Sequence, residues 1–225
     1  MNTLSLKREN LHIVSTTNTI SKAYTYGYQP IATGESAPNF YLPAQHAVTK
    51  QLLSGSLSRE AFITLQDLLD DQQSLVIAFL GAPGQAAVNI QQLEKLHTAI
   101  QAEGGRLIIF TAIEPKYLRR QLKQSNTLNL FYDADNTIAE LFGLYDIQNP
   151  LWQWISGIEE EEQSIPALYV IAPDSTIAFS YIDYSFNLFT DHPYPLQPVS
   201  KELFGVVNEL SVQYDYQPKA YKLVS

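Results

Sequence analysis

The stretch from residue 74 to residue 96, SLVIAFLGAPGQAAVNIQQLEKL, decides the fold class of this chain. Its residues 75–80 form a near-continuous apolar run, which is typical of a strand buried on both faces in a parallel sheet. A turn with glycine and proline follows, and apolar residues then recur at helical spacing over residues 88–102. A strand, a turn and a helix in this order predict an α/β sheet.

The turn after this strand is the first candidate site, because functional groups often sit on loops that a rigid scaffold positions. Its residues supply no thiol, acid or base; they are Gly81, Ala82, Pro83, Gly84, Gln85 and Val88 among others. The amide of Gln85 could hydrogen bond a ligand, although a solvated amide is the favoured interpretation. Free N–H groups at the helix start could bind an anion, but the lysine of a phosphate-binding loop is missing.

The remaining chain continues the same alternation of elements. Further strands are expected at residues 106–113, 128–133, 166–172 and 176–183, and further helices at 115–123, 136–144 and 199–214. The order βαβα followed by ββα predicts an α/β, thioredoxin-like fold with a mixed central sheet and helices on both faces. We expect an N-terminal extension over residues 1–33, one domain over 34–214 and a tail over 215–225.

Composition narrows the function classes. The chain contains no cysteine, which excludes disulfides, thiolate nucleophiles and Cys-ligated metal centres. A net charge of −9 and a pI near 4.8 argue against nucleic acids and anionic membranes as partners. No apolar run approaches the ~20 residues that span a bilayer, and the N-terminus lacks a signal-peptide core, so we predict a cytoplasmic protein.

Several segments in collinear order resemble peroxiredoxins of the alkyl hydroperoxide reductase and thiol-specific antioxidant family. GESAPNFYLP (residues 34–43) is similar to the opening G-x-x-A-P-x-F-x-L-P of that family, and LNLFYDADNTIAELFGL (128–144) is similar to its L-x-x-D-x-x-x-x-x-A-x-x-F-G-L segment. IPALYVIAPDSTIAFSYID (165–183) resembles its x-P-A-x-x-V-I-D-x-x-G-x-I hairpin. The resemblance covers about residues 34–210 and implies a thioredoxin fold and, frequently, a dimer.

The chain departs from this family at the residues that carry its chemistry. Ungapped counting places Gln85 and Val88 at the two cysteine positions, and Asn187 and Leu188 stand where D-Y-x-x-R supplies an arginine. Leu80 replaces the arginine at the end of the strand. Peroxide reduction in the family needs a thiolate that becomes a sulfenic acid, so this chain alone cannot carry out that reaction.

The resemblance also marks a vestigial pocket beside the turn. It implies that Pro166, Asp183, Tyr184 and Asn187 line this pocket, with Pro166 at the position where thioredoxin folds place a cis proline. The role expected for Pro166 here is to shape the chain.

Other residues with functional chemistry have weaker patterns. Trp152 and Trp154 stand beside the acidic run 159–162 and predict either an exposed interaction surface or core filling, with equal weight. The histidines show no metal-ligand spacing, and His97 is expected to be packed against the core face of its helix. Neither a metal nor a cofactor is predicted; the acidic run is interpreted as a solvated loop.

The sequence therefore favours a cysteine-less, peroxiredoxin-like protein without peroxidase activity. It would act as a binding module for a protein or a small molecule, through the vestigial site or the aromatic loop, and would form a homodimer. One alternative is an enzyme with a non-thiol mechanism that uses Gln85, the turn amides and Asp183, Tyr184 or His192. Another is a redox partner whose thiol is supplied by a second protein.

Overall fold

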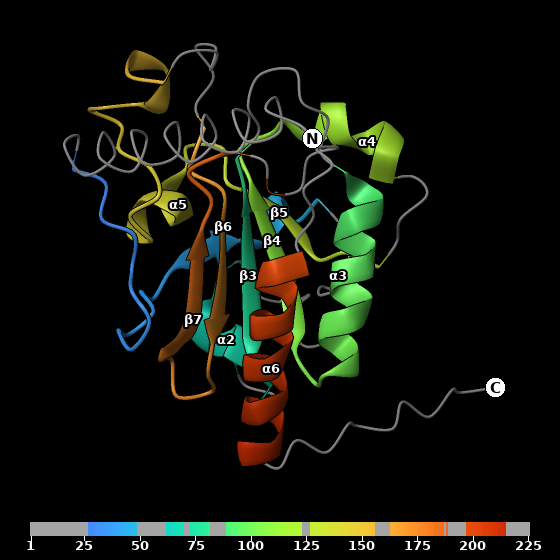
Figure 1. Cartoon of the computed structure of the whole chain (residues 1–225). Coiled ribbons are helices and arrows are strands. Elements are labelled where there is room, and N and C mark those ends of the chain that lie inside the picture. The colour runs from blue at the N-terminus through green and yellow to red at the C-terminus, as the bar shows by residue number, and fades with distance from the viewer. Residues whose placement is uncertain are drawn as a thin grey trace, which may run out of the picture.

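The computed structural model describes residues 27–48, 62–69, 73–81, 89–122, 127–155, 163–186, 188 and 197–214 (Figure 1). Its centre is a five-stranded sheet with the strand order β5-β4-β3-β6-β7. The strands are β3 (Leu75–Leu80), β4 (Arg106–Thr111), β5 (Leu130–Tyr132), β6 (Ala167–Ile171) and β7 (Ile177–Ile182). β3 is parallel to β4 and antiparallel to β6, so the mixed sheet predicted from the sequence is confirmed.

The helices cover both faces of this sheet, as the element order predicts. α3 (Ile90–Ala102) and α6 (Gln197–Gln213) lie side by side on one face, where α4 (Pro115–Leu122) also packs (Figure 1). α2 (Leu65–Leu69) and α5 (Thr137–Leu141) contribute side chains to the cluster on the other face. The expected strands and helices are thus present, most of them trimmed by a few residues at one end or both.

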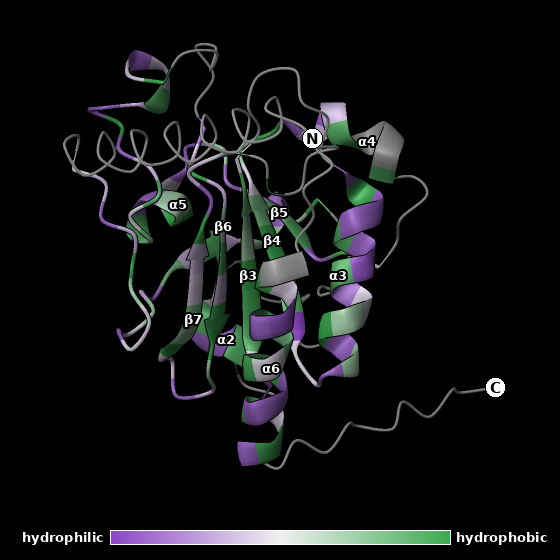
Figure 2. Ribbon diagram, in the orientation of Figure 1, coloured by the Kyte–Doolittle hydropathy of each residue, from purple (hydrophilic) through white to green (hydrophobic). Residues whose placement is uncertain are grey.

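Strand β3 supplies both hydrophobic clusters because it is apolar at every position. Ile77 and Phe79 point into the cluster beneath α2 and α5, and Val76, Ala78 and Leu80 point toward α3 and α6. All six residues of β3 are buried. Figure 2 shows the contrast with α3 and α6, whose apolar and polar residues share each helix. A strand that is apolar on both faces is buried from water when a layer of helices covers each face of the sheet.

A smaller antiparallel pair accompanies the main sheet. It is formed by β1 (Tyr41–Pro43) and β2 (Phe62–Thr64), and a short 3-10 helix, η1 (Ala44–His46), follows β1. A second 3-10 helix, η4 (Leu151–Gln153), follows α5 in the chain.

The end of the predicted N-terminal extension packs against the domain. Tyr28 is buried, its ring meets Trp154 edge to face at 5.4 Å, and its hydroxyl donates to the Asn149 carbonyl at 3.0 Å. Gly34 N–H donates to the Ile177 carbonyl at 2.8 Å, which places this segment along the edge of β7. The residues before 27 lie outside the described residues, and the division of the chain at residue 33 stays a prediction.

Substitutions at two glycines test whether the segment around Gln29 packs against the domain. Gly143 has a φ of +69°, and an added Cβ would lie 2.0 Å from the Gln29 carbonyl oxygen. We expect Gly143→Ala to lower the free energy of unfolding in urea by about 2 kcal/mol or more, from strain and clash together. Gly205 in α6 has nothing within 4 Å of an added Cβ. Gly205→Ala should raise stability by about 0.5–1 kcal/mol. Unchanged stability in Gly143→Ala would contradict the packing of this segment.

Candidate functional site

The candidate site lies where β3 ends and Gly81 begins the turn. Six of the predicted site residues lie outside the described residues; they are Ala82, Pro83, Gly84, Gln85, Val88 and Asn187. The frame around them is described. Gly81 follows β3, Pro166 precedes β6 and Asp183 follows β7, and these three strands are neighbours in the sheet.

Gly81 and Pro166 are in close contact. A Cβ added to Gly81 would lie 2.2 Å from the Ser164 carbonyl oxygen and 2.8 Å from two ring carbons of Pro166. Only a residue without a side chain fits at this position, because any Cβ would collide with backbone. The glycine that begins the turn is therefore required by packing, whatever chemistry the turn carries.

The peptide bond before Pro166 is trans, so the cis proline implied by the resemblance is not present. Ile165 N–H donates to the Leu144 carbonyl at 2.9 Å, and the Pro166 carbonyl accepts from Asp183 N–H at 2.8 Å. The second of these bonds continues the pairing of β6 with β7 by one residue, and the first joins the segment to the chain that follows α5.

The carboxylate of Asp183 is buried and accepts hydrogen bonds from the residues of the turn that follows it. It accepts hydrogen bonds from Ser185 N–H at 3.0 Å, from the Ser185 hydroxyl and from Leu188 N–H at 2.6 Å. Its backbone carbonyl accepts from Phe186 N–H at 3.2 Å. A carboxylate whose lone pairs hold a turn in place is a structural acceptor, and this geometry does not favour Asp183 as a general base.

Tyr184 packs at the margin of the core. It is half-buried against the cluster that contains Tyr169, and its charge, if it ionised, would oppose ionisation of Tyr169. Burial is the larger cause that raises the pKa of Tyr169 well above its ordinary value of 10.0. The Tyr169 phenol therefore stays neutral at physiological pH.

Gln163 is a buried amide that the sequence did not single out. It is 6% exposed, and among the described residues neither its Oε1 nor its Nε2 has a hydrogen-bond partner. The next residue is Ser164, whose carbonyl oxygen lies against Gly81. An unpaired buried amide costs about 1–3 kcal/mol and is uncommon in folded proteins. Its sequence context, the end of an acidic run, contains no signal that predicts burial.

The two tryptophans of the aromatic loop have different environments. Trp154 is buried, and its indole N–H donates to the Asn149 carbonyl at 3.2 Å, so core filling is the correct interpretation for this residue. Trp152 is 41% exposed. Of the two interpretations that the sequence left open, core filling thus applies to Trp154 and exposure to Trp152, which lie in and directly after the 3-10 helix η4. The acidic run 159–162 lies outside the described residues.

The residues considered for metal binding do not converge in the described part of the chain. His97 is buried on α3, and burial lowers its pKa below 6.5, which agrees with the predicted packed histidine. No group of three or more His, Asp or Glu residues with metal-binding geometry occurs among the described residues. Within the same residues, no helix is long and apolar enough to cross a membrane.

Comparisons with solved structures identify the type of fold. Peroxidoxin BcpB from Mycobacterium tuberculosis is 13% identical, with a TM-score of 0.53 over 80% of this chain and 97% of that one. The mitochondrial 2-Cys peroxiredoxin from Plasmodium falciparum is 10% identical, with a TM-score of 0.53 over 83% of this chain and 98% of that one. The thiol peroxidase from Chromobacterium violaceum is 13% identical, with a TM-score of 0.52 over 78% and 87%.

These neighbours place the chain among thioredoxin-like α/β folds. The particular type is the peroxiredoxin fold, and the chain carries it without a cysteine. No protein-family model and no curated protein matches the sequence. At identities this low the likeness concerns the fold, and the function has to be argued from the site.

Substitution of Asp183 distinguishes a structural carboxylate from a catalytic one. We expect Asp183→Ala to lower the free energy of unfolding by about 2–3 kcal/mol, because buried donors of the turn lose a charged acceptor. Asp183→Asn keeps one acceptor oxygen and should cost about 1 kcal/mol. The control is Asp174→Ala, since Asp174 is an exposed turn residue that accepts from Thr176 N–H at 2.9 Å. Equal urea midpoints for Asp183→Ala and the native chain would contradict this role.

Proposed function

We propose that this chain is a peroxiredoxin-fold protein without thiol peroxidase activity, which acts by binding. The observation that carries the proposal is the absence of any cysteine from a chain with this fold. No other side chain can pass through the sulfenic acid that peroxide reduction by this fold requires. The cytoplasmic location stays a prediction.

The geometry of the former site supports this proposal. Gly81 is fixed by its contact with Ser164 and Pro166, and Asp183 is occupied by its own turn. Packing is a sufficient explanation for the presence of Gly81, and hydrogen bonding is one for the presence of Asp183. The resemblance of this region to peroxiredoxins is thus accounted for by the fold alone.

The binding surface we assign is formed by Leu141, Ile147 and Trp152, here called the Trp152 surface. Their side chains are 45%, 64% and 41% exposed, and all three come from the segment that includes α5 and η4. Tryptophan is enriched among the residues that dominate binding energy, so Trp152 is the side chain on which this surface would centre.

The backbone around Trp152 is anchored to the core, which favours an interface at this side chain over exposure by chance. Its neighbour Leu151 is buried, and Trp154 is anchored by Tyr28 and by the Asn149 carbonyl. The backbone of η4 is thus anchored by Leu151 and Trp154, while the Trp152 side chain is exposed. The occupant we propose is a second copy of the chain, which agrees with the homodimer predicted from the sequence.

Sedimentation velocity over a concentration series tests this surface. The native chain should self-associate, and Trp152→Ala should raise the dissociation constant about tenfold or more, as for a central aromatic contact. Tyr117→Ala is the matched control, because Tyr117 on α4 is an aromatic residue with 67% exposure and lies outside the Trp152 surface. This control should associate like the native chain.

Salt provides a second readout of the same experiment. Two copies that each carry a net charge of −9 repel one another, so added salt should strengthen an apolar contact. A native chain that stays monomeric at every concentration would overturn the proposed dimer. So would equal dissociation constants for Trp152→Ala and Tyr117→Ala.

A further inference from the structure

Strand β7 is an edge of the central sheet, and its first half is already covered. Gly34 N–H donates to the Ile177 carbonyl at 2.8 Å, and Ile177 N–H donates to the Glu35 carbonyl at 2.8 Å. A bridge between Ser36 and Thr176 extends this pairing. The segment before β1 therefore acts as a short outer strand along the beginning of β7.

The second half of β7 has no such cover within the described residues. Asp183 N–H donates to the Pro166 carbonyl, and the alternation of antiparallel pairing then directs the backbone groups of Ser180 and Ile182 away from β6. The covering segment leaves the edge at Thr33, which contacts Ser180 through their hydroxyls at 3.2 Å. Among the described residues, none accepts from or donates to the outward backbone groups of Ser180 and Ile182.

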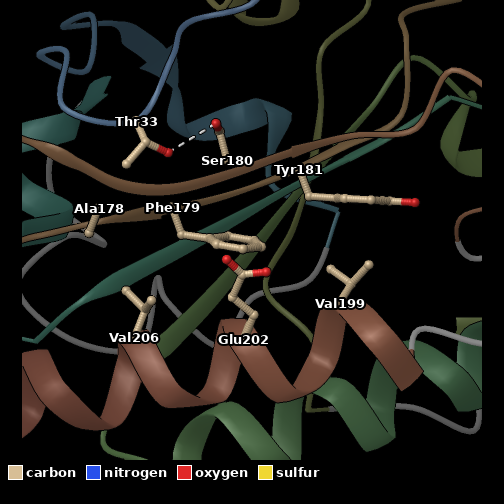
Figure 3. A pocket seen from close by; sticks show the side chains of 8 residues that line it. All are labelled: Thr33, Ala178, Phe179, Ser180, Tyr181, Val199, Glu202 and Val206. Atoms are coloured by element: carbon tan, nitrogen blue, oxygen red, sulfur yellow. Dashed lines mark hydrogen bonds between the residues drawn. The ribbon is translucent and has the colours of Figure 1, made fainter.

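A pocket of about 380 Å³ lies beside this uncovered edge, between β7 and α6 (Figure 3). The side chains of Phe179 and Tyr181 border it from the strand, and Val199, Glu202 and Val206 border it from the helix. Figure 3 shows the Glu202 carboxylate pointing toward the Phe179 ring, with a valine on either side. Glu202 is the single charged residue among those that line the pocket.

We propose that this edge and pocket bind an extended peptide as an added strand, with a cationic side chain between apolar ones. Backbone bonds to residues 180–182 would supply the pairing, as in other cases of strand addition. Alternate side chains of an added strand point to the same face. Those facing α6 would enter the pocket, where apolar groups meet Val199 and Val206 and the cation meets Glu202.

Charge decides the chemistry of this partner. The pocket lining contains a carboxylate and no lysine or arginine, and the whole chain carries a net charge of −9, which attracts cationic peptides. A second copy of the chain is a poorer occupant of the same edge. β7 itself contains no lysine or arginine, so its pairing with another β7 would bring no cation to Glu202.

The test is a titration of the full ¹⁵N-labelled chain with the synthetic peptide acetyl-Val-Thr-Lys-Thr-Val-amide, followed by amide chemical shifts. Its valines and lysine occupy one face of a strand. We expect shifts concentrated at residues 180–182 and 199–206. Glu202→Gln should weaken binding about two- to fivefold, as for an exposed ion pair. This variant leaves the backbone edge unchanged.

Three control peptides separate the parts of the proposal. A peptide with glutamate in place of lysine should bind more weakly than the lysine peptide. Of two peptides methylated at alternate backbone nitrogens, one in each phase, only the one whose methylated nitrogens face β7 should bind more weakly, because only there is a pairing donor lost. Equal binding of the lysine and glutamate peptides, or equal binding of the methylated peptides, would overturn the proposal. Protection of the Ser180 and Ile182 amides from exchange in the native chain without peptide, rising with protein concentration, would assign the edge to a second copy instead and would also overturn it.

Discussion

The structure depends on the burial of β3 on both of its faces. This strand pairs with β4 on one side and β6 on the other, and its six residues are 0–3% exposed. An apolar strand of this kind gains stability only when a layer of helices covers each face. The two hydrophobic clusters, with α3 and α6 on one side and α2, α5 and Tyr28 on the other, are the consequence.

The same constraint explains the contacts at the end of β3. Where β3 ends, Gly81 must lie against Ser164 and Pro166, and the turn after β7 is held by the buried carboxylate of Asp183. These contacts belong to the sheet and its connections. A thiol on the intervening turn makes no such contribution to folding, so it can be absent from a chain that keeps the fold.

The sequence predicted the elements with strong periodicity and missed features set by distant contacts. The apolar runs of β3 and β4 and the helical spacing of α3 are local signals, and all three elements are present as expected. The sequence left exposure and core filling equally open for Trp154, because its burial depends on the 3-10 helix η4 and on the distant Tyr28. The burial of Gln163 and the cover of β7 by residues 34–36 arise from segments far apart in the chain, so no local pattern encodes them.

The central claim is that the chain has the peroxiredoxin fold and no thiol peroxidase chemistry. Consumption of hydrogen peroxide by the purified full chain, with dithiothreitol as reductant and a boiled sample as control, tests it most directly. We expect a rate equal to that of the boiled control, because no cysteine is present to form a sulfenic acid. Heat-sensitive turnover above that control would contradict it and would require a non-thiol mechanism.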